Sequence, residues 1–192
     1  MIIKMKNAIW LLALMGVACS NQTESIEYGP GRTPADAELF SYPNIPDLQR
    51  AIVRTDGDII LEGDVTNGYL HGSHIAFGDE GRILSLTTYR YGKKHGLALT
   101  FDNLGYVETK ASYFDDQLDG EMMVYKRRKR VERKTYSNGV LHGLQQKYYP
   151  DGTKMEESNY LNGQIDGVAR WYDQQGNLTI EYEYDNGKLI EQ

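Results

Sequence analysis

The sequence contains a single cysteine, which excludes a disulfide bond within one chain. It also lacks a long hydrophobic run. The apolar stretch at residues 8–18 has eleven residues, whereas a membrane-spanning helix needs about 20. Positive charge is not in excess, since 27 acidic side chains stand against 21 basic ones and the formal net charge is −6. This balance excludes a general nucleic-acid binder, because contacts to phosphates require a basic face.

Motifs of catalysis are missing as well. There is no G-x-S-x-G motif and no phosphate-binding loop, because the glycines recur as periodic turn residues. The adjacent acids Asp115-Asp116 and Glu156-Glu157 are expected to diverge and to be solvated, since neighbours on a strand point to opposite faces. We therefore expect no catalytic residues, no cofactor and no enzymatic activity.

The first residues have the features of a targeting segment. Lys4 and Lys6 form a basic start, residues 8–18 are apolar, and Cys19 follows at once. The run Gly16-Val17-Ala18-Cys19 resembles the lipobox of bacterial lipoproteins, although Gly16 stands where leucine is usual. We expect residues 1–18 to be a signal peptide and Cys19 to carry a lipid anchor in the cell envelope, with the outer membrane as the expected membrane. Cleavage by ordinary signal peptidase, giving a secreted or periplasmic protein, and a buried free cysteine in a retained helix remain alternatives.

Residues 19–50 are expected to form a flexible tether and an N-terminal cap. Four of the five prolines lie at positions 30, 34, 43 and 46, in a polar context that buries too little apolar surface to fold alone. A few apolar side chains in this segment are expected to fold back over the first hairpin, because terminal units of repeat proteins need a cap. They are Leu39, Phe40, Tyr42, Ile45 and Leu48.

Residues 51–192 repeat with a period of about 24 residues. Successive leading glycines are separated by 24, 24, 23 and 24 positions, and a tyrosine series keeps the same phase. A fixed period between 20 and 50 residues is typical of repeat proteins, which bury their core between neighbouring units and usually bind through an extended surface. The repeat-defining residues are Gly72, Gly96, Gly120, Gly143 and Gly167, with Tyr89, Tyr113, Tyr136, Tyr160 and Tyr184.

Each unit predicts one β-hairpin. Two short runs end in aromatic residues and are bounded by Asn-Gly or Asp-x-x-Gly, which are turn signals because these residues tolerate positive φ. The residues one, three and five positions after the leading glycine share a strand face. Because the fifth is always Phe or Tyr, we expect this face to be the more apolar one. The sequence therefore predicts an all-β fold, an extended antiparallel meander of about five to six hairpin repeats.

The pattern G-x-x-(H/D)-G, a short run to an aromatic, D-x-x-G, and a run to Tyr and N-G resembles the MORN-type repeat. More closely it resembles the bacterial variant found in YwqK-family antitoxin-like proteins. The resemblance covers roughly residues 51–192. It implies hairpins stacked in an extended sheet and a non-enzymatic binding role.

One unit departs from the pattern. Between Gly120 and Tyr136 the turn glycine is missing, the unit is one residue short, and a basic run stands in its place, namely Lys126, Arg127, Arg128, Lys129 and Arg130. The run is either a solvated turn or a docking patch for an acidic partner or anionic lipid headgroups, and we take it as the candidate partner-binding site.

A row of His71, His95 and His142 shares one repeat position with Asp119 and Asp166. Equivalent residues in successive hairpins are expected to lie two strands apart, about 9–10 Å, which is too far for one zinc ion with ligands at about 2.0–2.2 Å. We therefore expect no metal site and interpret the row as turn chemistry.

The function predicted from the sequence is that of a non-enzymatic envelope lipoprotein with a repeat sheet that serves as a protein-interaction scaffold. An antitoxin- or immunity-like protein that neutralises a toxin by binding is the first alternative. A glycan- or lipid-binding surface protein, with exposed tyrosines stacking on sugar rings, is the second.

Overall fold

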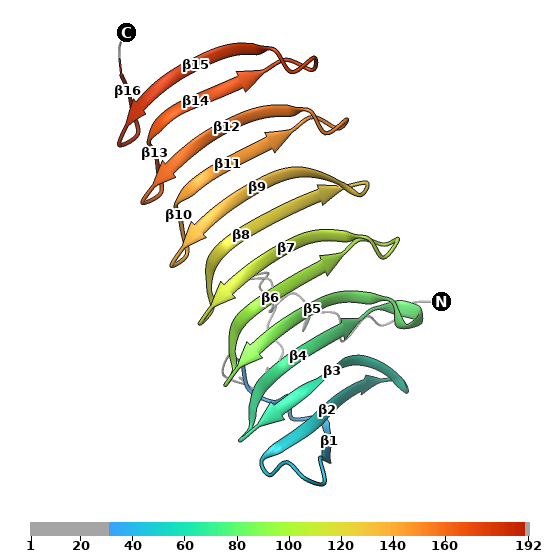
Figure 1. Ribbon diagram of the computed structural model, residues 1–192. Coiled ribbons are helices and arrows are strands. Elements are labelled where there is room, and N and C mark those ends of the chain that lie inside the picture. Colours follow the sequence, from blue (N-terminus) through green and yellow to red (C-terminus); the bar gives the residue numbers. More distant parts are fainter. Residues whose placement is uncertain (1–30, 191–192) are drawn as a thin grey trace, which may run out of the picture.

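The computed structural model describes residues 31–190. Within them a single open antiparallel sheet contains every strand, and the hairpins stack along one axis with a row of turns on either side (Figure 1). The strands are β1 (Glu38–Ser41), β2 (Leu48–Thr55), β3 (Asp58–Thr66), β4 (Tyr69–Phe77), β5 (Ile83–Arg90), β6 (Lys93–Phe101), β7 (Val107–Phe114), β8 (Gln117–Lys126), β9 (Lys129–Ser137), β10 (Val140–Leu141), β11 (Gly143–Tyr148), β12 (Lys154–Leu161), β13 (Gln164–Ile165), β14 (Gly167–Tyr172), β15 (Leu178–Asp185) and β16 (Lys188–Leu189), with one short 3₁₀ turn, η1 (Asp79–Gly81). The predicted all-β meander of hairpin repeats is confirmed.

The leading glycine of each unit lies inside a strand and not in a turn, which differs from the sequence interpretation. Gly72 has a φ of 67° in the middle of β4, and the β3–β4 register shifts beside it, between Gly63 and Asp64. This is a β-bulge, which bends and twists a strand and often requires glycine at positive φ. Turns and bulges both use left-handed glycine, so the sequence pattern alone did not separate them.

The tyrosine series keeps phase with the glycines because the two are cross-strand partners. In every full unit the tyrosine lies opposite the bulge glycine, in the pairs Gly72–Tyr89, Gly96–Tyr113, Gly120–Tyr136, Gly143–Tyr160 and Gly167–Tyr184. An aromatic ring opposite a glycine restores packing that the missing side chain cannot provide.

The two rows of turns differ. On one side two-residue turns such as Asn162-Gly163 have both residues at positive φ, 51° and 83°, which is the type I′ geometry that suits a twisted hairpin. On the other side most loops are longer and contain glycine, and the loops after β6 and β14 follow the Asp-x-x-Gly pattern. In the last of them Asp173 Oδ1 accepts hydrogen bonds from the main-chain N–H groups of Gln175 and Asn177.

The core is thin and consists of small side chains. Its buried apolar members are Ala51, Val53, Val65, Leu70, Ala76, Tyr89, Ala111 and Ala169, joined by the buried polar side chains of His74, Gln145 and Ser158. Four of them, His74, Ala76, Gln145 and Ala169, stand two or four positions after a leading glycine, on the face opposite the one expected to be more apolar. Small side chains are covered by longer neighbours, as Ala169 is opposite Tyr182.

The N-terminal end of the sheet is covered by the described residues before β1. Leu70 N donates to Gly31 O at 2.9 Å and Thr33 N to Gly68 O at 3.1 Å, while Ala37 packs against the first core cluster. Strand β1 and the start of β2 lie inside the segment 19–50 assigned to the tether, because an edge strand pairs through its backbone and needs few apolar side chains. The side chains expected to cover the first hairpin are largely exposed, with only Leu48 half-buried; the exposed ones are Leu39, Phe40, Tyr42 and Ile45.

Candidate partner-binding site

The basic run forms the tip of the β8–β9 hairpin. Lys126 pairs with Lys129, and the two residues between them, Arg127 and Arg128, have φ values of 49° and 68°. The hairpin therefore closes with a two-residue turn where neighbouring units use a longer glycine-containing loop. Arginine is a poor residue for left-handed backbone, which favours Gly, Asn and Asp. The two arginines therefore strain the backbone of the turn and lower its stability.

All five basic side chains are exposed, and among the described residues none forms an ion pair with a carboxylate. Three of them contact the neighbouring loops. Arg128 lies over the Tyr106 ring at 4.9 Å, Arg130 lies over the Tyr148 ring at 4.5 Å, and Lys129 Nζ donates to the main-chain oxygen of Asp151. These contacts position the side chains without pairing any of them directly with a carboxylate.

A shallow open groove of about 400 Å³ lies between this turn and the next loop. It is lined by Tyr125, Lys129, Arg130, Tyr148, Asp151 and Gly152. The Asp151 carboxylate is held by the Thr153 main-chain N–H at 2.8 Å, and hydrogen bonds from Thr153 keep the pKa of Asp151 below its ordinary value. The groove thus offers two cations beside two phenol rings, a combination suited to an anionic, extended ligand.

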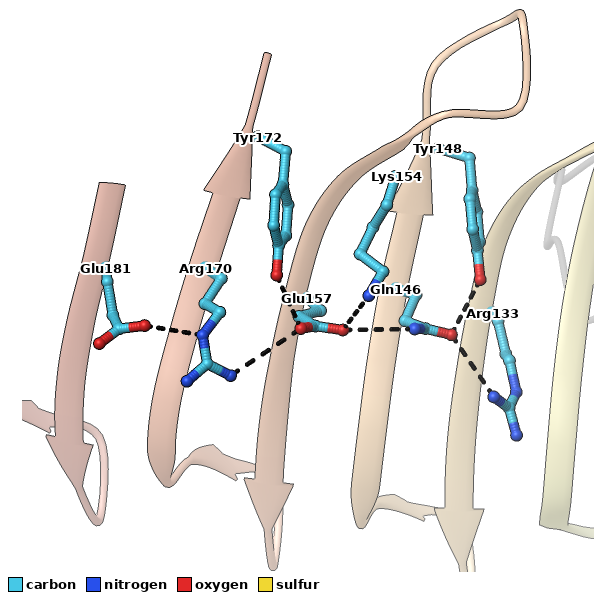
Figure 2. Close-up of polar contacts among 8 residues, drawn as sticks. All are labelled: Arg133, Gln146, Tyr148, Lys154, Glu157, Arg170, Tyr172 and Glu181. Atoms are coloured by element: carbon cyan, nitrogen blue, oxygen red, sulfur yellow. Dashed lines mark hydrogen bonds and ion pairs between the residues drawn. The ribbon is translucent and has the colours of Figure 1, made fainter. Parts of the chain in front are cut away.

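A second polar feature crosses the face beside the groove (Figure 2). Side chains from β9, β11, β12, β14 and β15 form a continuous chain of hydrogen bonds and ion pairs, which we name the polar ladder; its members are Arg133, Gln146, Tyr148, Lys154, Glu157, Arg170, Tyr172 and Glu181. At its β9 end Arg133 also binds Glu121 on β8.

Glu157 is the centre of the polar ladder. It accepts hydrogen bonds from Lys154 at 2.6 Å and from the Tyr172 hydroxyl at 2.9 Å, and Arg170 Nη1 lies 3.9 Å away. Partial burial raises the pKa of Glu157, but the bonds from Lys154 and Tyr172 outweigh it and leave the pKa below its ordinary value. The ladder is therefore an internally satisfied ionic network, in contrast to the basic turn.

The tyrosines of this face do not form an open stacking platform. A cation lies over each of two ring faces, Arg130 over Tyr148 and Lys154 over Tyr172 at 5.4 Å. Sugar rings stacking on these aromatic faces would have to displace the cations, which weakens the glycan-binding alternative.

The row of His and Asp residues contacts the turn of the following unit. Asp119 Oδ2 accepts from Asn138 N and Asp166 Oδ2 accepts from Asn186 N, while His95 Nδ1 lies 3.2 Å from Asp115 Oδ1. The position therefore fastens successive hairpins to each other. Across residues 31–190 no group of three or more His, Cys, Asp or Glu side chains is arranged to hold a metal ion.

The comparison with known families agrees with this geometry. The family model described as the MORN repeat variant matches residues 141–162 and 165–186. These two hairpins are MORN-type repeats. The hairpins before them share the same pairing of bulge glycine and tyrosine, so the same hairpin arrangement continues along the sheet. No curated protein matches the chain.

Sequence reasoning singled out the basic run but missed its surroundings. Tyr125, Tyr148 and Asp151 border the groove because the next loop folds beside the turn, which requires the register of β9 and β11. Glu157 was expected to be solvated together with Glu156, but its side chain is only 18% exposed and lies at the centre of the polar ladder. Arg133, one period earlier on β9, was not singled out. Cys19 lies outside the described residues, and no long apolar helix that could span a membrane occurs among residues 31–190.

Proposed function

We propose that the protein is a non-enzymatic cell-envelope lipoprotein whose MORN-type sheet binds an acidic segment of a protein partner in the groove beside the basic turn. One observation supports this above all. Five consecutive cationic side chains are exposed and unpaired with carboxylates, next to two tyrosines, in a chain with a net charge of −6.

The groove suits binding better than chemistry. It is shallow and open to solvent, and its one carboxylate, Asp151, is occupied by Thr153. An extended acidic segment would place carboxylates near Arg130 and Lys129 and its apolar parts against Tyr125 and Tyr148. Guanidinium–carboxylate pairs are among the stronger hydrogen bonds because both partners are ionised.

The anchoring part of the proposal rests on the leader, in which a basic start and an apolar stretch precede Cys19. The closer resemblance to antitoxin-like proteins would make the partner a toxin and would leave the binding surface unchanged. Identification of the captured partner decides between these two forms.

The test is crosslinking and affinity capture from the native envelope with the full chain and a variant in which Arg127, Arg128 and Arg130 are replaced by glutamine. Partner capture should fall, most clearly at low salt, because attraction between exposed charges is screened over about 8 Å at 0.15 M. A control replaces Arg54, Lys93 and Lys188 by glutamine, which changes the net charge equally on β2, β6 and β16.

Equal loss of capture in both variants would indicate an unspecific charge effect. Full capture by the arginine variant at every salt concentration would contradict the basic groove as the binding site.

A further inference from the structure

Strand β15 has one side that is only partly paired. On one side it pairs with β14 from Leu178 to Tyr184. On the other side β16 pairs only with Tyr184 and Asp185, and Ile190 N donates to Glu183 O at 2.8 Å. Among residues 31–190 nothing pairs with residues 178–182 on this side.

The backbone of this edge is oriented for another strand. Because the Glu183 carbonyl faces β16, the alternation of an extended strand directs the N–H and C=O groups of Glu181 to the same side. An unpaired row of this kind is a template for pairing with another chain, and many proteins bind peptides by adding a strand to such an edge.

The side chains of the edge divide by face. Ile180 and Tyr182 are each 45% exposed and share one face of β15, whereas Leu178 lies beyond the register shift, opposite Tyr172. Glu181 points to the opposite face, where it ends the polar ladder (Figure 2). The edge thus presents a short apolar row, Ile180 and Tyr182, on one face and a carboxylate on the other.

The preceding repeat shows which side chains pair with the equivalent strand. Glu157 occupies the same repeat position as Glu181, 24 residues earlier. Beside β12, strand β14 places Arg170 opposite Glu157 and Trp171 opposite Glu156, and the Tyr172 hydroxyl reaches Glu157 as well.

Strand β16 repeats the beginning of this arrangement. Tyr184 pairs with Leu189 as Tyr160 pairs with Ile165, and the bond from Ile190 N to Glu183 O matches that from Asp166 N to Asn159 O. No described strand takes the corresponding place of β14 beside β15.

We propose that residues 178–182 form a second interaction site, which accepts an extended strand of a partner protein, antiparallel to β15, with a basic residue opposite Glu181 and an aromatic residue opposite Ile180. The guanidinium or ammonium group would share the Glu181 carboxylate with Arg170, as Lys154 and Arg170 share Glu157. The aromatic ring would cover the exposed apolar row.

Charge argues against a second copy of this chain as the occupant. Its two exposed edges are β1, which starts with Glu38, and β15 itself, with Glu181 and Glu183. Pairing either edge with β15 brings carboxylates together, and like charges directly opposite each other destabilise a sheet. The site is distinct from the basic groove, which lies at the β8–β9 turn and favours an acidic ligand.

The experiment measures binding of a labelled peptide that copies residues 167–172, Gly-Val-Ala-Arg-Trp-Tyr, to the full chain. Saturable binding is expected. A control peptide with glutamate at the arginine position should bind about tenfold more weakly, since the change replaces an attraction by a repulsion. A third peptide, N-methylated at the arginine amide, should also bind more weakly because that amide can no longer pair with the edge.

Charge reversal in the protein locates the site. The Glu181→Lys variant should prefer the glutamate peptide. The Glu183→Lys variant, which changes an exposed acid of the same strand whose backbone is already used by Ile190, should keep the original preference. The peptide test does not involve the basic turn, so its failure and the failure of the proposed function are separate results.

An unchanged preference in Glu181→Lys, or equal binding of the three peptides, would overturn the proposal. So would concentration-dependent dimerisation in sedimentation that Glu181→Lys abolishes, because the occupant would then be a second copy.

Discussion

The His74 ring lies against Gly63, its direct cross-strand partner, so closely that a Cβ at position 63 would overlap the imidazole. His74 is buried at 4% exposure, its Nε2 lies 2.6 Å from the Asp64 carbonyl oxygen, and its ring meets Tyr89 edge-on. Glycine and histidine at these two positions therefore depend on each other.

We predict that Gly63→Ala destabilises the protein by about 1–3 kcal/mol, the usual cost of overpacking a filled site. In the double variant with His74→Ala the added methyl group has room. The loss of stability in the double variant should therefore be clearly smaller than the sum of the losses in the two single variants. Urea unfolding of the four proteins of this cycle measures the coupling; strict additivity would show that the steric conflict is absent.

His74 also predicts a pH dependence of stability. Burial lowers its pKa, and the bond to the Asp64 carbonyl only partly opposes this. The unfolded chain, with a histidine pKa of about 6.5, then binds a proton more readily than the folded protein. The stability that depends on a neutral, buried His74 is therefore fully present above pH 6.5. It is lost as the pH falls from there through the lower pKa of the folded state.

The matched variant is His74→Gln, because Gln145 occupies the same repeat position and is buried. Below pH 6.5 the thermal midpoint of this variant should fall less steeply with falling pH than that of the parent, because the contribution of His74 is absent. Identical slopes in the two proteins would mean that His74 does not titrate at a lowered pKa.

The polar ladder should contribute to stability mainly through Glu157. Glu157→Gln removes the charge that Lys154, Tyr172 and Arg170 share, and we expect a loss of about 1–3 kcal/mol in urea unfolding. Glu181→Gln is the control, because it changes the same repeat position where the side chain is exposed and bonds to Arg170 alone; its loss should stay below about 1 kcal/mol. Equal losses would show that burial and partner number do not matter here.

Cys19 gives a prediction that concerns the leader alone. If it is acylated, Cys19→Ser should fail to incorporate a palmitate analogue and should move from the membrane to the soluble fraction. Retained membrane association without any acyl label would exclude the lipid anchor.

The hairpins could be predicted because their determinants are local. Asn162-Gly163 and similar pairs specify a type I′ turn through the backbone preferences of two residues, and the 24-residue period repeats that signal. The bulge at Gly72 could not be separated from a turn, since glycine at positive φ serves both. Its cross-strand partner Tyr89 was visible only as a residue with the same period.

The polar ladder and the groove depend on register between units. Which residues of β9 face β11 follows from the bulges and from the shortened turn at Arg127 and Arg128, so Arg133 and Gln146 meet only in the folded sheet. A two-residue change of register would keep these side chains on the same face but place other residues opposite each other. The basic run was recognisable because it breaks the repeat, whereas its partner Tyr148 belongs to the regular aromatic series and Tyr106 occupies a position that varies between units.

We propose that the β8–β9 turn is basic because it binds a partner, at the expense of stability. The most direct test replaces Arg127→Asn and Arg128→Gly, which installs the residues that a type I′ turn prefers and leaves the rest of the groove unchanged. We predict a free energy of unfolding higher by about 1–3 kcal/mol, because the left-handed strain is relieved, together with clearly weaker capture of the envelope partner at low salt. Undiminished capture by this variant across salt concentrations would contradict the claim.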